Sequence, residues 1–396
     1  DRQVLGLLAP ELQRAIGWSE TQYAHIIVAF QAAYALGLLA FGRIIDRLGT
    51  RRGYALAVVL WSVAAAGHAL AASVTGFGVA RFALGLGEAG NFPAAIKAVA
   101  EWFPQRERAL ANGLFNSGCN IGAILAPLLV PWLALRGGWP LPFIILGAAG
   151  FIWLFAWLHW YQPPALTPQL TPAERAHIAA GAAAEPAGRI RCRQLLRHRA
   201  TWAFITGYAL TAPIWWFYLY WLPKFLNQRF GLNLLQLGGP LILIYVLASL
   251  GSIGGGWLSS GLLRRGWSLN AARKTAMLGC AVCVLPVSAV TLTDQVWVAA
   301  ALIGLAASAH QGWAANLFAL ATDLFPKPAV ASVVGLGGMA GALTAMAFAE
   351  STGFILAHSG SYWILFVIAS MAYLAAWGII HGLIPRWQPV AATDDL

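Results

Sequence analysis

Arg81 and Glu88 carry opposite charges within one apolar stretch, residues 76–101. At 3.6 residues per turn, their spacing places them on nearly the same face of a helix, about 10 Å apart along its axis. An arginine can hold a carboxylate by two parallel hydrogen bonds, which are stronger in a low-dielectric site than in water. A buried carboxyl group beside an arginine can exchange a proton when an anion arrives. The pair is therefore suited to binding an anion and a proton, although a static ion pair between helices is the alternative.

A second acid and base, Asp1 and Arg2, precede the short apolar run 4–10. The chain opens without Met, so we interpret this run as part of a helix whose first half is missing. Ionisable groups at membrane depth cost about 2.5 to 3.5 kcal/mol to insert and usually face a cavity or a partner. We expect Arg2 to bind the anion together with Arg81, and Asp1 to carry protons together with Glu88.

The second half of the chain offers aromatic and neutral polar groups instead of charges. Trp216 and Tyr220 provide flat faces, and Gln311 and Asn316 provide amide donors and acceptors of the kind that sugar hydroxyls need. For the rings, packing against lipid or a neighbouring helix is the alternative; for the amides, it is a bond to another helix. His310 has the side chain to titrate near neutral pH, but packing is the more common role for a single histidine in a helix.

The elements that hold these residues must be membrane-spanning helices. Of 396 residues, 59% are hydrophobic and 10% charged, whereas soluble domains carry about 25% charged residues, which excludes a water-soluble fold. A span needs roughly 20 apolar residues. With the incomplete first helix, the apolar runs predict an all-α membrane protein of twelve helices, the eleven complete spans being 20–42, 54–74, 76–101, 109–132, 140–160, 200–223, 234–262, 274–293, 296–322, 329–357 and 361–384.

Basic residues are distributed unequally between the two sides of these spans. Eighteen fall in one set of loops and four in the other, and the positive-inside rule then predicts cytoplasmic termini. The net charge of +11 is expected to meet anionic lipid headgroups, and no nucleic-acid partner is expected. Lys97 lies near the cytoplasmic end of its span, and we expect its side chain to extend to the interface.

The longest polar stretch, residues 161–199, predicts a cytoplasmic linker between two six-helix halves, residues 1–160 and 200–396. Within the linker, Thr171 to Glu174 form a capping-box pattern that predicts a short surface helix. Glycines in two of the spans are expected to allow close helix contacts. They are Gly251, Gly254, Gly255, Gly256, Gly335, Gly337, Gly338 and Gly341.

Cysteine chemistry and catalysis are not expected. Cys280 and Cys283 form a CxxC inside an apolar run with no second pair or histidine nearby, so we interpret them as packing residues, with metal binding as the alternative. The sequence shows no nucleophile and base pair and no metal cluster, so we expect no enzyme activity, cofactor or metal.

The segment from Gly42 to Arg52, GRIIDRLGTRR, resembles the G-x-x-x-D-R-x-G-R-R motif of the major facilitator superfamily, with Thr50 as an additional residue. Further segments are similar to the hexuronate branch of its anion:cation symporter family. This resemblance implies a fold of two six-helix halves and proton-driven uptake of sugar acids such as glucuronate or galacturonate across a bacterial inner membrane. The segments are AEWFPQRERALANGLFNSGCNIGAILAP, WWFYLYWLPKFL, AHQGWAANLFALATDLFP and SVVGLGGMAG.

The resemblance also implies roles for particular residues. The substrate site of related symporters matches Asp1, Arg2, Tyr34, Arg81 and Glu88 in this chain. Four residues of the segment from Gly42 to Arg52 are expected to form a cytoplasmic latch. The alternative is that the positive charge of this segment only fixes the orientation of the helices in the membrane. The latch residues are Asp46, Arg47, Arg51 and Arg52.

One departure bears on specificity. Where hexuronate-branch relatives often have Lys-Phe-Leu-Thr-Asp-Pro, this chain has Tyr208 to Pro213, with Ala212 at the acidic position. Joint loss of both charges leaves no orphan buried charge, so the fold is expected to survive. The predicted function is a monomeric symporter that binds a sugar acid and H+ and contacts membrane lipids. An organic-anion exchanger, an aldonate or aldarate symporter, and a non-transporting membrane sensor are the alternatives.

Overall fold

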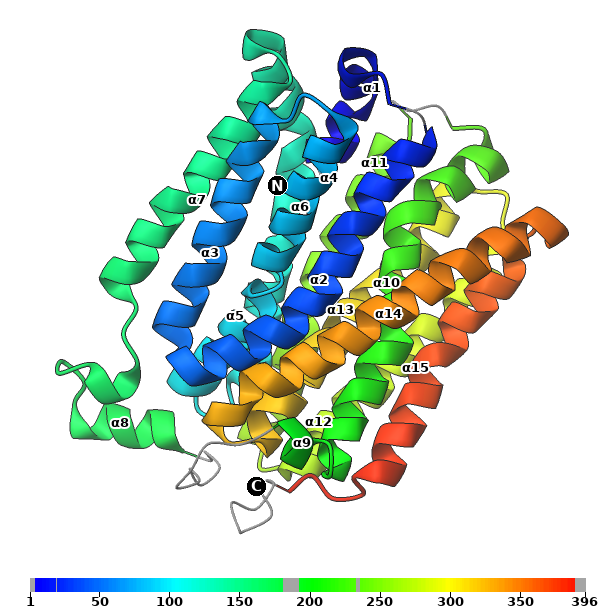
Figure 1. Ribbon diagram of the computed structural model, residues 1–396. Helices are drawn as coiled ribbons and strands as arrows, with labels where there is room; N and C mark the ends of the chain where they lie inside the picture. Colours follow the sequence, from blue (N-terminus) through cyan, green and yellow to red (C-terminus); the bar gives the residue numbers. More distant parts are fainter. Residues whose placement is uncertain (1–3, 19, 181–191, 233–235, 389–396) are drawn as a thin grey trace. The chain divides into compact units, whose positions relative to one another are not determined.

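The computed structural model describes residues 4–18, 20–180, 192–232 and 236–388. In these ranges the chain folds into helices, with no strand (Figure 1). Residues 4–180 form α1 (Val4–Ile16), α2 (Glu20–Leu48), α3 (Thr50–Gly67), η1 (His68–Leu70), α4 (Val74–Glu88), α5 (Asn91–Trp102), α6 (Arg108–Gly137), α7 (Pro140–Trp160), η2 (Pro164–Leu166) and α8 (Pro172–Ala179). Residues 192–388 form α9 (Cys192–Leu195), α10 (Arg199–Phe230), α11 (Gly238–Arg264), α12 (Leu269–Val284), η3 (Leu285–Leu292), α13 (Val296–Leu324), α14 (Lys327–Ser359) and α15 (Trp363–Leu383).

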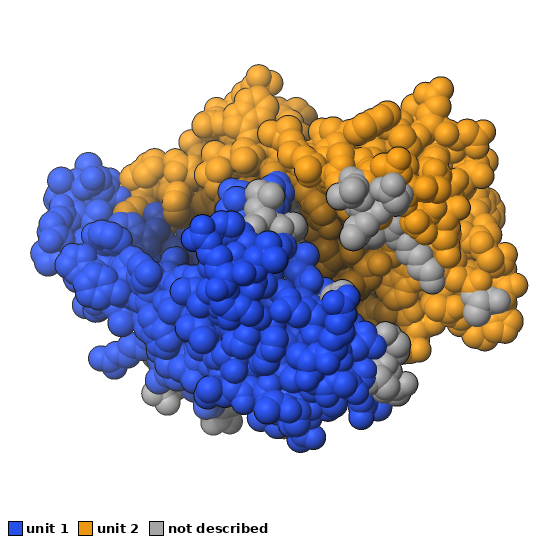
Figure 2. Space-filling model, turned by 90° about the horizontal axis from the view of Figure 1, so that it is seen from above, with its two compact units in different colours: residues 1–102, 121–175, 330–339 blue, residues 103–120, 176–329, 340–396 orange. Residues whose placement is uncertain are grey.

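These helices form two compact units, shown in different colours in Figure 2. In unit 1, α2 packs against α4, and α3 packs against α4 and α7. In unit 2, α11 packs against α13, and α10 against α15. Three helices contribute to both units: the first part of α6 and the second half of α8 belong to unit 2, and a short part of α14 belongs to unit 1. Unit 1 holds residues 1–102, 121–175 and 330–339, and unit 2 holds residues 103–120, 176–329 and 340–396.

The predicted spans coincide with these helices. Each of the eleven complete spans matches one long helix or two consecutive helices. Seven segments of the described residues are long and apolar enough to cross a membrane. α7 shows the expected surface, because Ile152 and Phe155 are 74% and 73% exposed, which suits contact with lipid. The chain is a multi-pass, all-α membrane protein.

One predicted span is divided. Residues 76–101 were expected to form one helix, but α4 ends at Glu88 and α5 begins at Asn91. Pro93 has no backbone N–H, so it cannot donate to the carbonyl of Ala89, four residues earlier. The division falls directly after Glu88 and thus places this carboxyl group at a helix end within the span.

Local sequence explains several helix ends. Ser73 and Ser268 cap α4 and α12, each accepting a hydrogen bond from the backbone N–H three residues later. The predicted capping box is confirmed: Thr171 N donates to Glu174 Oε2 at 2.8 Å, and Glu174 N donates to Thr171 Oγ1 at 3.2 Å. These hydrogen bonds lower the pKa of Glu174, because they favour its ionised form.

The predicted close helix contacts are confirmed at glycines of both units, although a Cβ atom on Gly254 would meet no atom within 4 Å. In unit 1, a Cβ atom on Gly335 of α14 would collide with the carbonyl oxygen of Leu38 on α2. In unit 2, a Cβ atom on Gly256 of α11 would collide with the carbonyl oxygen of Ala109 on α6. Only a glycine allows the backbones to approach this closely.

The segment that departs from its relatives packs without charges. A Cβ atom added to Gly341 of α14 would lie within 3.1 Å of the Ala212 Cβ and closer still to the Tyr208 ring. The Tyr208 ring also contacts the rings of Phe204 and Phe318, both at 5.9 Å between centroids. At this position, the Tyr208 ring of α10 therefore packs against Phe318 of α13 and Gly341 of α14.

Candidate functional site

Arg81 and Tyr34 lie at one interface of unit 1, between α2 and α4. The Arg81 guanidinium carbon stands 5.4 Å from the centre of the Phe30 ring, and this ring stacks on Tyr34 with 5.9 Å between centroids. Arg81 is 5% exposed and Tyr34 9%. Ring faces attract a guanidinium most when water is excluded. The structure thus brings together two of the predicted site residues and adds Phe30, which the sequence analysis did not select.

Glu88 is half-buried at the end of α4. It shares an electrostatic neighbour with Arg81, because both act on His68, a fully buried side chain just after α3. His68 Nδ1 bonds to the Ala64 carbonyl at 2.7 Å, and its ring stacks on Phe143 at 5.0 Å. The sequence analysis missed His68, and the only available signal was an imidazole near the end of an apolar run.

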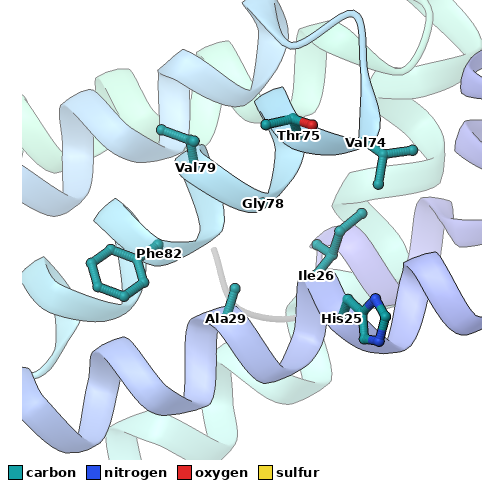
Figure 3. A pocket seen from close by; sticks show the side chains of 8 residues that line it. All are labelled: His25, Ile26, Ala29, Val74, Thr75, Gly78, Val79 and Phe82. Atoms are coloured by element: carbon teal, nitrogen blue, oxygen red, sulfur yellow. The ribbon is translucent and has the colours of Figure 1, made fainter.

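The other two residues predicted for this site, Asp1 and Arg2, lie outside the described residues. A cavity of about 400 Å³ opens between α2 and α4 and is lined almost entirely by apolar atoms. Figure 3 shows the lining side chains, which include none of the predicted site residues. A sugar acid needs polar partners, so this cavity does not suit one. It is lined by His25, Ile26, Ala29, Val74, Thr75, Gly78, Val79 and Phe82.

Asp46 links three helices of unit 1 at the predicted cytoplasmic end. Its Oδ1 pairs with Lys97 Nζ at 2.8 Å, and its Oδ2 accepts the backbone N–H of Ser332 at 2.7 Å. Ser332 is the sixth residue of α14, so its N–H is not one of the four that the start of a helix leaves free. The prediction that Lys97 extends to the interface was wrong. The side chain is 5% exposed and turns inward because Asp46 offers a partner.

The other predicted latch residues do not join Asp46. Arg47 and Arg52 are exposed, and Arg51 donates to the Leu158 carbonyl of α7. In the same region, Glu101 accepts hydrogen bonds from Thr50 and Tyr161. Burial and the Glu101 charge raise the pKa of Tyr161. Of the four latch residues, Asp46 is the one whose contact here reaches a helix from the other half of the sequence.

Unit 2 contains a buried ionic cluster at its predicted cytoplasmic end. Arg273 Nε lies 2.9 Å from Asp323 Oδ2, and Arg108 Nη1 lies 3.7 Å from Asp323 Oδ1. The side chains of all three are at most 2% exposed. Arg108 and Arg273 were expected in loops at the ends of their spans, and Asp323 just beyond the span 296–322; instead α6 begins at Arg108, α12 includes Arg273 and α13 extends to Leu324. The position of a charged residue in the sequence does not show which side chain of another helix it pairs with.

Loss of the Asp323 carboxylate is expected to destabilise the protein strongly. Asp323→Asn leaves two buried guanidinium groups without their shared counter-charge, which costs about 3 to 5 kcal/mol of unfolding free energy. Asp294→Asn is a matched control, because Asp294 pairs with Arg229 at 2.7 Å but is 89% exposed, and exposed pairs contribute little. Thermal unfolding in detergent should show a large decrease in Tm for the first variant alone; equal values would contradict the assignment.

The second-half candidates occupy two places in unit 2. Trp216 and Tyr220 stack on each other along α10, 5.7 Å between centroids, and Tyr220 is 46% exposed. On α13, Gln311 Oε1 accepts a hydrogen bond from Asn116 Nδ2 of α6. Asn316 Nδ2 donates to the carbonyls of Gly255 and Gly312 at 3.0 and 2.9 Å. Of the two rings, Tyr220 is exposed, whereas both amides bond to neighbouring backbone or side-chain groups.

His310 is held by aromatic neighbours. Its Nδ1 bonds to Tyr373 Oη at 2.5 Å, and its ring stacks on Trp215 at 5.1 Å. In the part of the chain that the structure describes, no three His, Cys, Asp or Glu side chains gather as metal ligands would. His310 therefore has the contacts of a packing residue.

Taken together, unit 1 offers a buried guanidinium beside two aromatic rings and a half-buried carboxyl group that share His68 as an electrostatic neighbour. A guanidinium can bind a carboxylate with two hydrogen bonds. A carboxyl group near it can exchange a proton with water or ligand. These groups can bind an anion and a proton. Binding of this kind leaves the covalent bonds of the anion unchanged.

Comparisons with known proteins agree with this fold. A sequence model described as Major Facilitator Superfamily matches residues 1–349. The Hexuronate transporter of Escherichia coli K12 is 35% identical over 389 residues, covering 96% of this chain and 90% of that protein. The Galacturonate transporter of Dickeya chrysanthemi is 38% identical over 261 residues, covering 65% and 76%.

The solved structure of the proton:xylose symporter XylE matches with a TM-score of 0.75 at 14% identity, covering 98% of this chain and 93% of that chain. At this identity the likeness shows the fold alone. The family match and the 35% identical relative go further. The chain belongs to the Major Facilitator Superfamily and is a membrane transport protein, not an enzyme.

Proposed function

We propose that the chain is a proton-coupled symporter that imports a sugar acid, most of all a hexuronate, across a bacterial inner membrane. The observation that carries the proposal is the buried Arg81 beside the Phe30 ring, with the half-buried Glu88 at the end of the same helix. The names of the two relatives supply the substrate class. The chain acts as a monomer with both termini in the cytoplasm.

Arg81 is the anchor for the substrate carboxylate. Its position against the Phe30 ring holds the guanidinium plane in place, so less side-chain freedom is lost when the anion binds. Tyr34 stacks on the same ring and supplies a hydroxyl for the sugar. The aromatic face of Trp216 and Tyr220 is proposed to contact the sugar ring, and Gln311 and Asn316 are proposed to reach its hydroxyls after exchanging their present partners.

Glu88 is the proton carrier. A protonated Glu88 leaves the Arg81 charge available to the substrate, whereas an ionised Glu88 competes for it. Binding of the anion therefore favours the protonated carboxyl group, and release of the anion favours loss of the proton. By their likeness to related symporters, Arg2 and Asp1 are proposed to assist in these two tasks.

Alternating access is proposed to move the halves 1–160 and 200–396 about this site, as the two halves do in related folds. The inner gate is the set of contacts that join helices from different halves at the cytoplasmic end. Asp46 bonds to Ser332 in unit 1, and Arg108 pairs with Asp323 in unit 2. Both must break before substrate can leave to the cytoplasm. Arg47 at the end of α2, and Arg51 and Arg52 at the start of α3, are proposed to support this gate.

Competition for uptake tests the substrate class. Proteoliposomes with an inward pH gradient are given radiolabelled galacturonate together with an excess of unlabelled glucuronate, galactonate, galactarate or neutral galactose. We expect glucuronate to compete best and galactose not at all, because Arg81 requires a carboxylate. Equal competition by galactose would contradict the role of Arg81, and stronger competition by galactonate or galactarate would assign the aldonate or aldarate alternative.

A further inference from the structure

Two contacts set the register between α6 and α13 in unit 2. Arg108 donates to the carbonyl of Thr322, and Asn116 donates to the side chain of Gln311. As the residue number rises along α6 it falls along α13, so the two segments run antiparallel. On α6, the residue midway between these two contacts is Asn112. On α13, the midway position is Asn316 or its neighbour. The register therefore places Asn112 and Asn316 at the same level.

Asn112 is fully buried, and neither its Nδ2 nor its Oδ1 has a hydrogen-bond partner among the described residues. Asn316 is also fully buried. Its Nδ2 has two carbonyl partners, but its Oδ1 likewise lacks a partner within these ranges. A direct bond from Asn112 Nδ2 to Asn316 Oδ1 would satisfy both residues in part, yet no such bond forms. At one level of unit 2, two buried amides on α6 and α13 therefore have three unsatisfied atoms between them.

The neighbouring interface of α6 is too tight to hold anything. A Cβ atom on Gly113 would collide with the Ser252 carbonyl oxygen, and one on Gly256 with the Ala109 carbonyl oxygen, both between α6 and α11. Asn112 shares a stripe of α6 with Arg108 and Asn116, at intervals of four residues, and both of these reach α13. Asn116 Nδ2 also donates to Ser252 Oγ of α11 at 3.3 Å, so Asn112 lies on a face of α6 that is turned toward α13 and borders α11.

We propose that Asn112 and Asn316 bind a buried water molecule between α6 and α13. Buried waters form two to four hydrogen bonds with otherwise unsatisfied polar groups, and this site offers one amide donor and two carbonyl acceptors. Leaving the same atoms without a partner would be strongly unfavourable. The water fills the gap between the amide pair Asn116–Gln311 and the ionic cluster around Asp323, so that a continuous polar seam runs along α6.

The seam bears on how the gate opens, and this step rests on the proposed alternating access. Two amides that bond directly to each other lose that hydrogen bond when α6 and α13 separate. A hydrated pair only exchanges one water for others. The bound water therefore lowers the barrier to opening at Asn112, while Arg108 and Asp323 supply the contacts that hold the seam closed.

Radiolytic footprinting tests the water site in the unmodified protein. Short X-ray pulses generate hydroxyl radicals from bound water, and the radicals oxidise adjacent side chains, which mass spectrometry identifies. We expect oxidation within residues 109–116 and 313–320 about fivefold above that of Phe366, which packs among the rings of Phe217 and Phe225 and has no polar partner for water. Oxidation no higher than that of Phe366 would overturn the proposal, whatever the protein transports.

Two variants test the residue and its role. Asn112→Leu fills the site with an apolar group and is expected to abolish the labelling; Asn112→Ser keeps a donor and acceptor and should retain it. The leucine variant should also reduce the uptake rate severalfold with an unchanged apparent affinity, whereas the serine variant should not. Labelling that persists in Asn112→Leu contradicts the assignment of the site. Lost labelling with an unchanged uptake rate contradicts the role in opening alone.

Discussion

Arg81→Ala abolishes measurable binding of the sugar acid, if Arg81 is the anchor for its carboxylate. Charge-assisted hydrogen bonds contribute about 1.5 to 3 kcal/mol each, and an arginine fork makes two. Their loss weakens binding by about 100-fold or more, since 1.4 kcal/mol corresponds to a factor of 10. Isothermal calorimetry with galacturonate and purified protein in detergent measures this effect. Arg81→Lys keeps the charge but not the fork, and should bind with intermediate affinity.

Arg136→Ala is the matched control for this experiment. The Arg136 guanidinium also lies over an aromatic ring, 4.0 Å from the centre of the Trp132 ring, but the residue is exposed at the end of α6. Its removal should leave the affinity unchanged. Near-normal affinity in Arg81→Ala would contradict the anchor assignment, and equal weakening in both variants would attribute the effect to general loss of positive charge.

Glu88→Gln is expected to abolish accumulation driven by a pH gradient while exchange of substrate across the membrane persists. Glutamine has nearly the same shape as glutamate but cannot release a proton, so it resembles the protonated carrier at every pH. The loaded protein can then alternate between its two states, but no gradient drives it in one direction. Uptake of labelled substrate into proteoliposomes measures accumulation under a pH gradient, and exchange when unlabelled substrate is inside.

Glu350→Gln provides the control, because Glu350 is an exposed carboxyl group on α14. This change should leave both accumulation and exchange as they are. Undiminished gradient-driven accumulation in Glu88→Gln would refute its role as the proton carrier. Loss of exchange together with accumulation would show that Glu88 is needed for binding or for folding, and calorimetry and thermal unfolding of Glu88→Gln itself distinguish these two.

The sequence predicted the helices well because a membrane span is a long apolar run bounded by polar residues. The break between α4 and α5 escaped this reasoning, although Gly90 and Pro93 stand at it. Hydropathy averages over the whole run and ignores which backbone N–H is missing. The capping box at Thr171 was predicted from residue types alone because its contacts are local.

The ionic contacts were harder to predict than the helices. Lys97, Arg108 and Arg273 all stand near span ends, where long side chains usually reach water. In the structure they pair with Asp46 and Asp323, which come from distant parts of the sequence. A pattern along one helix places a charge near the interface, but the partner comes from tertiary packing. The same limit explains why His68 and Asn112 were not selected.

Proton movement during substrate entry tests the central claim most directly, namely that sugar acid and proton cross together. Proteoliposomes with a pH-sensitive dye in a weakly buffered interior receive galacturonate outside, at equal pH on both sides and with the membrane potential clamped by potassium and valinomycin. We predict acidification of the interior on addition of galacturonate, absent with galactose and absent in Glu88→Gln. Entry of labelled galacturonate at the normal rate without acidification would contradict the account.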